Sequence, residues 1–239
     1  MAKRWSILAI LLGIFAACLF VATVLSLVLG LDLAVQPPNH PETLDLPSRL
    51  IALQPYREAR WPLDAVSSLL YVVAFGALTL AAVQIAALAG SDRRAGLLQS
   101  AILVAGILGV TTGLLYIGAT KVTIDQQYCD CGFKIQESIS QFWAINIVQG
   151  ATNWLSYGAI VFSAIALGLS SLALANRGLS TAWHVLAWTA AVLLVLSIPA
   201  HEFIDSPLGD LLAALATGLL IPAWAILLAM RSTDRLSVG

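Results

Sequence analysis

The sequence predicts an all-α fold, a polytopic transmembrane six-helix bundle, on two observations. First, the 239 residues are 59% hydrophobic and only 10% charged, with a mean hydropathy of +0.89, whereas soluble domains carry about 25% charged residues. Second, the charged residues stand in short groups between six apolar runs, each long enough to cross a bilayer as a helix. We therefore expect a single membrane domain over residues 1–239, in contact with the lipid bilayer. No basic patch is large enough to indicate a nucleic-acid partner.

The six expected spans follow the apolar runs in chain order. The first is longer than the roughly 7–15 apolar residues of a signal peptide. The second span ends at Gly90, the fourth at the helix-stop sequence of residues 176–178, and the fifth at Pro199. Pro222 predicts a kink in the sixth. The expected spans are 5–31, 63–89, 95–120, 150–175, 181–198 and 208–230.

Three longer connections are expected to be loops on one face of the membrane, the outer face. These loops are residues 32–62, 121–149 and 199–207. The first loop holds six prolines, Pro37, Pro38, Pro41, Pro47, Pro55 and Pro62. Because proline cannot continue the interior of a helix, we expect no long helix to cross this region.

The distribution of charge predicts that both termini are cytoplasmic. With this orientation, the cytoplasmic segments hold seven of the 12 Lys and Arg residues. The outer segments hold eleven of the 13 Asp and Glu residues. This asymmetry satisfies the positive-inside rule, and we expect a multi-pass protein of the cell membrane.

A stripe of polar residues precedes the fourth span. Asn146, Gln149, Asn153 and Tyr157 recur at helical spacing within residues 141–176, a stretch without a charged side chain. At about 1.5 Å per residue, Asn153 lies roughly 35 Å along a helix from the end of this stretch, and the hydrocarbon core is about 30 Å thick. We therefore expect the stripe to extend above the bilayer, as one wall of a platform on the outer face.

Two cysteines, Cys129 and Cys131, lie in the expected loop 121–149, on the side that is oxidising in most cells. Cysteines two apart close a small ring, which strains the Cα separation and dihedral angle of a disulfide. Three interpretations stay open: a strained local disulfide, free thiols or pairing with another chain, and a metal or redox site. The spacing differs from the C-x-x-C of thioredoxin-like and zinc motifs.

A group of acidic residues and one histidine lies near the outer ends of the second, fifth and sixth spans. Histidine, carboxylate and thiolate are common metal ligands, so these residues form either a mixed site with the cysteines or a solvated loop with helix-capping acids. The sequence H-E-F-I-D from His201 is not the H-E-x-x-H of zinc hydrolases. We predict no metal site, no cofactor and no catalytic residue. The candidate ligand-binding residues of the outer face are Asp64, Asn146, Gln149, Asn153, Tyr157, His201, Glu202 and Asp210.

Small residues recur every four positions in the third span. They are Ala105, Gly109 and Gly113, with Gly106 alongside. Such ridges let helix backbones approach closely in lipid. We expect a packing seam here, either within the chain or between two chains as a self-association face.

Three short sequences carry a resemblance to a known family. They are N-W-L-S-Y-G-A at 153–159, L-A-N-R-G at 174–178 and I-P-A-W-A-I-L-L-A at 221–229. Together with the length and the hydropathy layout, they resemble an uncharacterised family of six-span bacterial membrane proteins. The resemblance implies six spans in a bacterial plasma membrane and no known catalytic residues.

The residue types within the spans distinguish between classes of membrane protein. No Lys, Arg, Asp, Glu or His lies clearly at mid-membrane, where proton-coupled transporters, pumps and voltage sensors normally need them. The sequence also lacks G-x-S-x-G, a Walker loop and a dinucleotide fingerprint. We expect a non-enzymatic binding or assembly module with its polar site on the outer face. The alternatives are a membrane enzyme or metal/thiol redox protein that uses the outer Cys, His and Glu residues, and a small-molecule transporter.

Overall fold

The computed structural model describes residues 2–35, 46–91, 93–127, 135–204 and 206–234. Six helices in these ranges are long and apolar enough to cross a membrane, and no strand occurs within them. The candidate spans are Ile7–Gly30, Pro55–Ala89, Arg93–Thr120, Asn146–Ala173, Thr181–Ile204 and Pro207–Arg231. The expected all-helical, multi-pass fold is therefore confirmed at this level.

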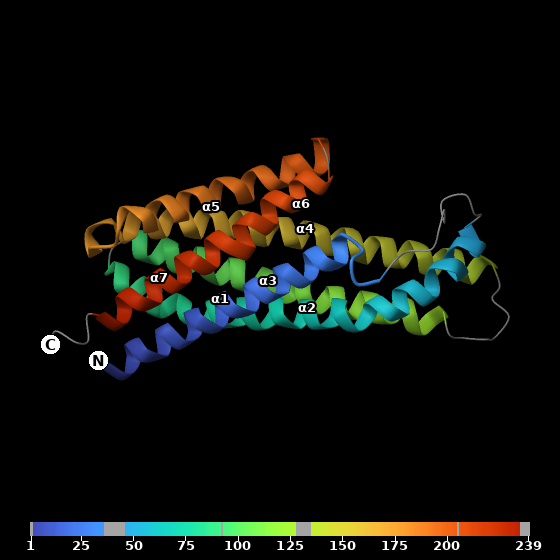
Figure 1. The fold of residues 1–239 in the computed structure, drawn as a ribbon, viewed down its shortest axis with the longest axis horizontal. Helices are drawn as coiled ribbons and strands as arrows, with labels where there is room; N and C mark the ends of the chain where they lie inside the picture. The colour runs from blue at the N-terminus through green and yellow to red at the C-terminus, as the bar shows by residue number, and fades with distance from the viewer. Residues whose placement is uncertain (1, 36–45, 92, 128–134, 205, 235–239) are drawn as a thin grey trace.

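The helices follow one another in a simple order (Figure 1). The fifth span ends in a π-helical segment, η3, and a second π-helical segment, η4, interrupts the sixth span. A short 3₁₀ turn, η2, follows the fourth span. The elements are α1 Ala2–Gly30, α2 Leu46–Ala89, α3 Arg93–Gln127, α4 Ile135–Ala173, η2 Ala175–Arg177, α5 Thr181–Pro199, η3 Ala200–Ile204, α6 Ser206–Leu215, η4 Ala216–Leu220 and α7 Ile221–Asp234.

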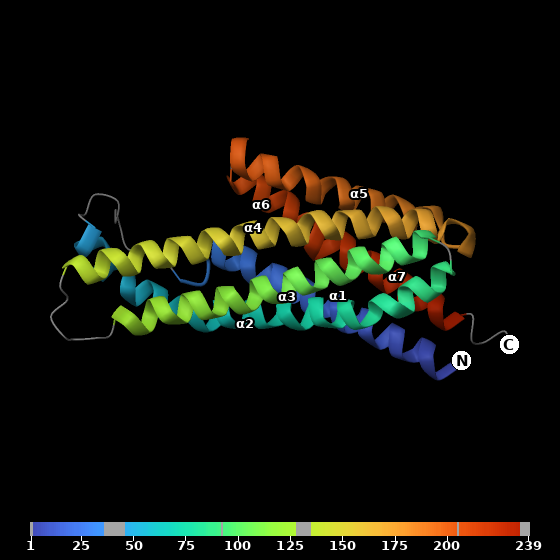
Figure 2. The same cartoon turned by 180° about the vertical axis from the view of Figure 1, so that it is seen from behind.

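Neighbours in sequence are mostly neighbours in space. α1 packs against α2 and α7, and the chain then continues with α2 on α3, α3 on α4 and α4 on α5 (Figure 2). The start of α1 and the end of α7 lie at the same end of the bundle (Figure 1). Within the described residues, six helices run from one end of the bundle to the other, and an even number of passes returns the end of the chain to the side where it began.

Three helices are much longer than the others. α2 has 44 residues, α3 has 35 and α4 has 39, whereas α5 has 19. At 1.5 Å per residue these lengths are about 66, 52, 58 and 29 Å. Residues 46–54, 121–127 and 135–145 of the long helices lie beyond the candidate spans, and we call them the helical extension. Figure 1 shows it at the end opposite the two termini.

The expected loops 32–62 and 121–149 are therefore wrong over most of their length. α2 begins at Leu46 and passes through both Pro55 and Pro62. Each proline removes one helical hydrogen bond, at a cost of about 3 kcal/mol in a helix interior, and the packing of α2 against α1 and α3 offsets this loss. The segment expected to be the third loop, 199–207, contains the π-helical η3 instead of irregular chain.

The expected irregularity at Pro222 takes the form of a π-helical segment. η4 ends immediately before α7, and the Ile221 N–H donates to Ala216 O, five residues back. A proline ring clashes with the carbonyl four residues before it in an α-helix. The wider π turn over Ala216–Leu220 relieves that clash.

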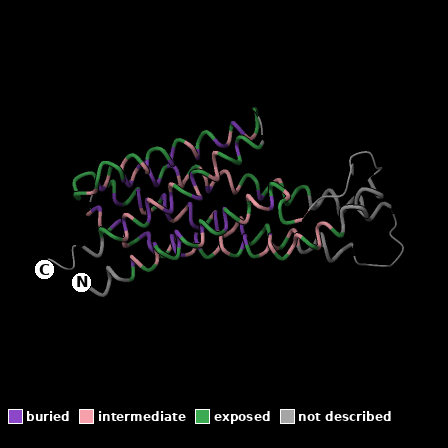
Figure 3. The backbone as a smooth tube through the Cα atoms, viewed as in Figure 1, coloured by how far each residue is buried: buried purple, intermediate pink, exposed green. Residues whose placement is uncertain are grey.

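The core of the bundle is built largely from small side chains. Ala74, Ala81 and Ala82 of α2 are fully buried, together with Leu12 of α1 and Leu98 of α3. Figure 3 shows the buried residues on the inward helix faces and exposed residues on the outward faces. Small side chains allow close approach of helices, and packing of this kind drives their association in lipid.

The small-residue seam of α3 packs within the chain. A Cβ atom on Gly109 would overlap the Phe75 ring of α2, and one on Gly113 would lie 2.7 Å from Val72 Cγ2. Ala105 is fully buried. Self-association through the Ala105/Gly109/Gly113 face is therefore wrong, because α2 of the same chain already covers it.

Candidate functional site

Four side chains at the junction of α1 and α2 form a hydrogen-bonded group, which we call the Arg60 cluster: Asp32, Tyr56, Arg60 and Asp64. Tyr56 Oη donates to Asp32 Oδ1 at 2.6 Å, and Arg60 Nη1 donates to Tyr56 Oη at 2.7 Å. Arg60 Nε donates to Asp64 Oδ2 at 3.1 Å, and Arg60 Nη1 lies 3.6 Å from Asp32 Oδ1. One guanidinium therefore bridges two carboxylates from different parts of the chain.

The Arg60 cluster follows from the register of α2. Tyr56, Arg60 and Asp64 are four residues apart, so a continuous helix stacks them on one face. α1 ends at Gly30, and the chain turns so that Asp32 has a φ of 52°. Aspartate is one of the few residues that adopts this left-handed conformation readily.

Burial makes the Arg60 cluster a strong connection. The Asp64 side chain is 11% exposed and the Arg60 side chain 26%. Opposite charges attract more strongly when they are partly withdrawn from water. The cluster therefore holds the end of α1 against α2, next to the first residues of the helical extension.

A second polar group joins α4 to the connection between α5 and α6. We call it the Tyr157 cluster: Tyr157, His201, Glu202 and Asp210. Tyr157 Oη donates to Glu202 Oε1, and His201 Nδ1 lies 3.2 Å from Asp210 Oδ1. The adjacent residues His201 and Glu202 thus contact two different helices, and together they link α4, η3 and α6.

The local backbone explains how the Tyr157 cluster forms. α5 ends at Pro199 and passes into the π-helical η3, a form often found at functional sites. A Cβ atom on Gly209 would lie 2.5 Å from the His201 backbone nitrogen. Glycine at this position therefore allows the first turn of α6 to approach η3 and places Asp210 beside His201.

The Tyr157 cluster is far more open to solvent than the Arg60 cluster. The Asp210 side chain is 67% exposed and the His201 side chain 36%, so their ion pair contributes at most about 1 kcal/mol to stability. Glu202 is also exposed. The two carboxylates can therefore accept hydrogen bonds from cationic or hydroxyl-bearing groups of a ligand.

The polar stripe of α4 continues this open surface. Asn146, Gln149 and Asn153 are exposed. Trp154 is 76% exposed and packs edge-to-face on Tyr157, with ring centroids 6.0 Å apart. The stripe thus runs from the Tyr157 cluster toward the helical extension.

The predicted site residues divide between the two clusters. Tyr157, His201, Glu202 and Asp210 come together, while Asp64 binds Arg60 in the other cluster. The two cysteines of the expected loop 121–149, Cys129 and Cys131, lie outside the described residues, so the disulfide, thiol and metal interpretations stay predictions.

Sequence reasoning missed Asp32, Tyr56 and Arg60. The cause was the expected loop 32–62, which hid the helical spacing of Tyr56, Arg60 and Asp64. That four-residue spacing is the signal that identifies the cluster once α2 is allowed to continue through its prolines.

Hydroxyl groups make several of the polar contacts between α1, α2 and η4. Thr23 Oγ1 of α1 lies 3.1 Å from Thr217 Oγ1 of η4 and 3.4 Å from Tyr71 Oη of α2. Ser67 Oγ donates to Ala22 O at 3.1 Å. Such contacts tie membrane helices together and each contribute on the order of 1 kcal/mol.

Within the described ranges, no three His, Cys, Asp or Glu residues are grouped so that they could hold a metal ion. Comparison of the chain with protein-family models, with curated proteins and with solved structures gave no match in any of the three. The resemblance to six-span bacterial membrane proteins therefore remains a hypothesis.

Proposed function

We propose that this protein is a non-enzymatic binding or assembly module of the bacterial plasma membrane. Its polar site is the Tyr157 cluster with the exposed stripe of α4, on the outer face. The observation that supports this proposal is that the Tyr157 cluster joins α4 to the α5–α6 connection and the Arg60 cluster joins the end of α1 to α2, while the helical extension lies at the end opposite the termini (Figure 1). The two clusters hold α2 and α4, two of the helices that continue into the extension, and so support the platform.

The orientation of this platform rests on charge. The side of the bundle that carries the termini is rich in arginine: the connections between helices there, and the end of α7, contain Arg93, Arg94, Arg177 and Arg231. Basic residues favour the cytoplasmic side of a membrane. The helical extension, at the opposite end, therefore faces outward.

The packing of the bundle argues against an internal pathway. Ala74, Ala81 and Ala82 are fully buried where a transport route would pass between α1, α2 and α3. The interhelical polar contacts there come from Ser, Thr and Tyr hydroxyls. A proton-coupled transporter normally places ionisable groups at that depth.

Site-specific photo-crosslinking tests the binding function. A photoreactive amino acid at Asn153 is expected to give a discrete product in native membranes, and Glu202→Gln with Asp210→Asn is expected to remove it. Leu172 is a matched control, because it is exposed on the same helix at the other end. Identical products from both positions would argue against a binding site at the Tyr157 cluster.

Two further measurements separate the alternatives. A stoichiometric metal in the purified protein that is lost on Cys129→Ser would support the enzyme or redox alternative. Solute flux into liposomes that depends on the protein would support the transporter alternative.

Labelling of Asn153→Cys in whole cells by an impermeant thiol reagent, in a chain whose 3 cysteines are replaced by serine, checks the orientation. Ser91→Cys should react only after the cells are opened.

A further inference from the structure

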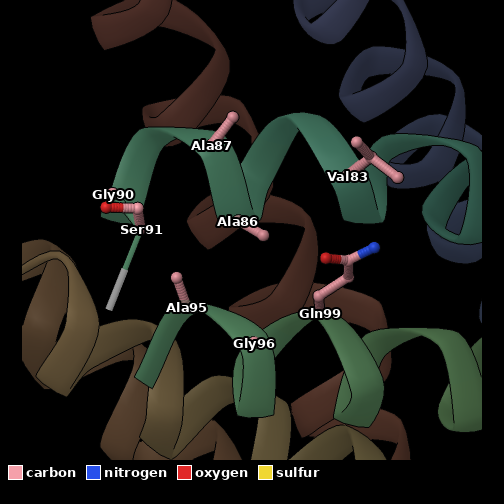
Figure 4. A pocket seen from close by; sticks show the side chains of 8 residues that line it. All are labelled: Val83, Ala86, Ala87, Gly90, Ser91, Ala95, Gly96 and Gln99. Atoms are coloured by element: carbon pink, nitrogen blue, oxygen red, sulfur yellow. The ribbon is translucent and has the colours of Figure 1, made fainter. Parts of the chain in front are cut away.

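Two hollows lie in the groove between α2 and α3. The first, the end hollow, has a volume of about 340 Å³ and lies beside the tight turn between the helices; it is lined by Val83, Ala86, Gly90, Ala95, Gly96 and Gln99, among others. Figure 4 shows Ala86 of α2 and Ala95 and Gln99 of α3 directed into this space. The second, the middle hollow, has a volume of about 440 Å³ and is lined by Gly76, Thr79, Leu80, Ile107, Val110 and Thr111.

The helical register shows that the two hollows belong to one groove. The lining positions of α2 are 76, 79, 80, 83, 86, 87 and 90. Those of α3 are 95, 96, 99, 107, 110 and 111. On α2 the positions recur in steps of three and four residues, and on α3 the two sets are eight residues, or about two turns, apart. The hollows therefore follow one another along the same helix pair.

The depth of the groove matches one leaflet of a bilayer. The end hollow lies at Gly90, just past Ala89, where the second candidate span ends. Thr79 in the middle hollow is ten residues earlier, or about 15 Å along the helix. That is half of the roughly 30 Å hydrocarbon core. The groove therefore runs from the membrane surface to the middle of the bilayer.

The end hollow has a polar and cationic rim. Ser91 and Gln99 contribute a hydroxyl and an amide to its lining. Arg93 and Arg94 are exposed in the first turn of α3, directly after this connection. Arg177 donates from Nη2 to Ala89 O at 2.9 Å, which brings a third guanidinium to the wall at Gly90. The turn itself holds one acidic residue, Asp92. The three arginines near the end hollow therefore outnumber it.

The middle hollow is apolar in its chemistry. The Thr79 hydroxyl, the main polar group on its α2 side, already donates to Phe75 O at 2.7 Å. Leu80 is 68% exposed and Ile107 58% exposed at its edges. This part of the groove therefore presents hydrocarbon surface to the bilayer.

We propose that the groove binds one anionic phospholipid from the leaflet on the side of the termini. The phosphate-bearing headgroup occupies the end hollow, beside Ser91, Gln99 and the arginines, and an acyl chain lies in the middle hollow. Charge complementarity at the rim, an apolar inner half and a length of one leaflet together specify this ligand. The proposal requires only that α2 and α3 span a membrane, so it is independent of the function proposed for the outer face.

Two glycines provide a test that leaves the packing of the protein intact. An added Cβ atom on Gly76 meets no atom within 4 Å, so a side chain at this position starts in open space, and Gly76→Leu is expected to fill the middle hollow. Gly13 of α1 is equally unobstructed and lies outside the groove, so Gly13→Leu is the matched control. Arg93→Gln with Arg94→Gln removes two positive charges beside the end hollow without changing its lining.

Native mass spectrometry of the delipidated full chain measures the result. Palmitoyl-oleoyl phosphatidylglycerol is expected to bind in preference to the matched phosphatidylcholine, by about fivefold for each arginine that faces the phosphate. Gly76→Leu should weaken binding of both lipids, the double arginine variant should remove only the preference, and Gly13→Leu should change neither.

Three outcomes would overturn the proposal. Equal binding of both lipids by the unaltered chain would exclude a specific anionic site. An equal loss in Gly13→Leu and Gly76→Leu would show that the lipid binds elsewhere. A dimer that disappears in Gly76→Leu, with lipid binding unchanged, would identify the occupant as a second copy of the chain.

Discussion

At the scale of single residues, Arg60 makes the most consequential contact in the half of the bundle away from the termini. It is the cation shared by Asp32 and Asp64, and it also donates to Tyr56. A guanidinium suits this task because its donors lie in a fixed planar fork and it stays charged when it is partly buried. A change at this residue acts on both carboxylates at once.

We predict that Arg60→Gln destabilises the protein by about 1–3 kcal/mol, because it leaves the poorly exposed Asp64 carboxylate without its cation. Thermal unfolding in detergent, followed by tryptophan fluorescence, measures the change. Asp64→Asn in the same chain should recover part of the loss, since it removes the uncompensated charge. Additive losses in the double variant would show that the two side chains are not coupled.

At the scale of elements, close contact between α2 and α3 keeps the long helices together. Glycines of α3 remove the side chains that would separate the helices, and Phe75 of α2 fills the space above Gly109. α2 also packs against α1 and α3, and it continues through Pro55 and Pro62. Tertiary packing therefore extends a helix through residues that favour its termination.

We predict that Gly109→Leu lowers the free energy of unfolding by about 1–3 kcal/mol, because the new side chain must displace the Phe75 ring or separate the helices. Gly118→Leu, on the same helix, is the control, since an added Cβ atom there meets nothing within 4 Å. Unfolding temperatures of the two variants provide the comparison. Equal effects would contradict a seam located at Gly109.

At the scale of the whole molecule, the unequal helix lengths determine how the protein sits in a bilayer. α5 and η3 together cover one candidate span, whereas α2, α3 and α4 all continue beyond theirs. We therefore expect the membrane surface to cross the long helices near the Tyr157 and Arg60 clusters, and residues of α4 beyond that level to meet water.

We predict a change of environment along the exposed face of α4. Nitroxide labels at Ile147, Val161, Ile165 and Leu172 all occupy exposed positions. The first and last are 25 residues apart, or about 38 Å, more than the roughly 30 Å hydrocarbon core. Labels at Val161 and Ile165 should be accessible to oxygen, and the label at Ile147 to a water-soluble nickel chelate. Oxygen-dominated accessibility at Ile147 would place this part of α4 inside the membrane.

Much of the fold could be predicted from the sequence because the bilayer imposes it. A membrane helix must satisfy its own backbone hydrogen bonds and needs about 20 apolar residues. Both requirements are local, so the six apolar runs predict six spans, and the stop at residues 176–178 and Pro199 place their ends within a few residues. The sequence suggested only that Tyr157, His201 and Glu202 share an outer face. It did not predict that they form one cluster.

Tertiary structure decided the features that depend on contacts between distant residues. The sequence alone determined that this chain is a six-span helical membrane protein. It did not determine that α2 continues through Pro55 and Pro62, that the α3 glycines face α2 of the same chain, or that Asp64 binds Arg60. Helix propensity and hydropathy are sums over neighbouring residues, whereas packing and ion pairing depend on which faces meet in space.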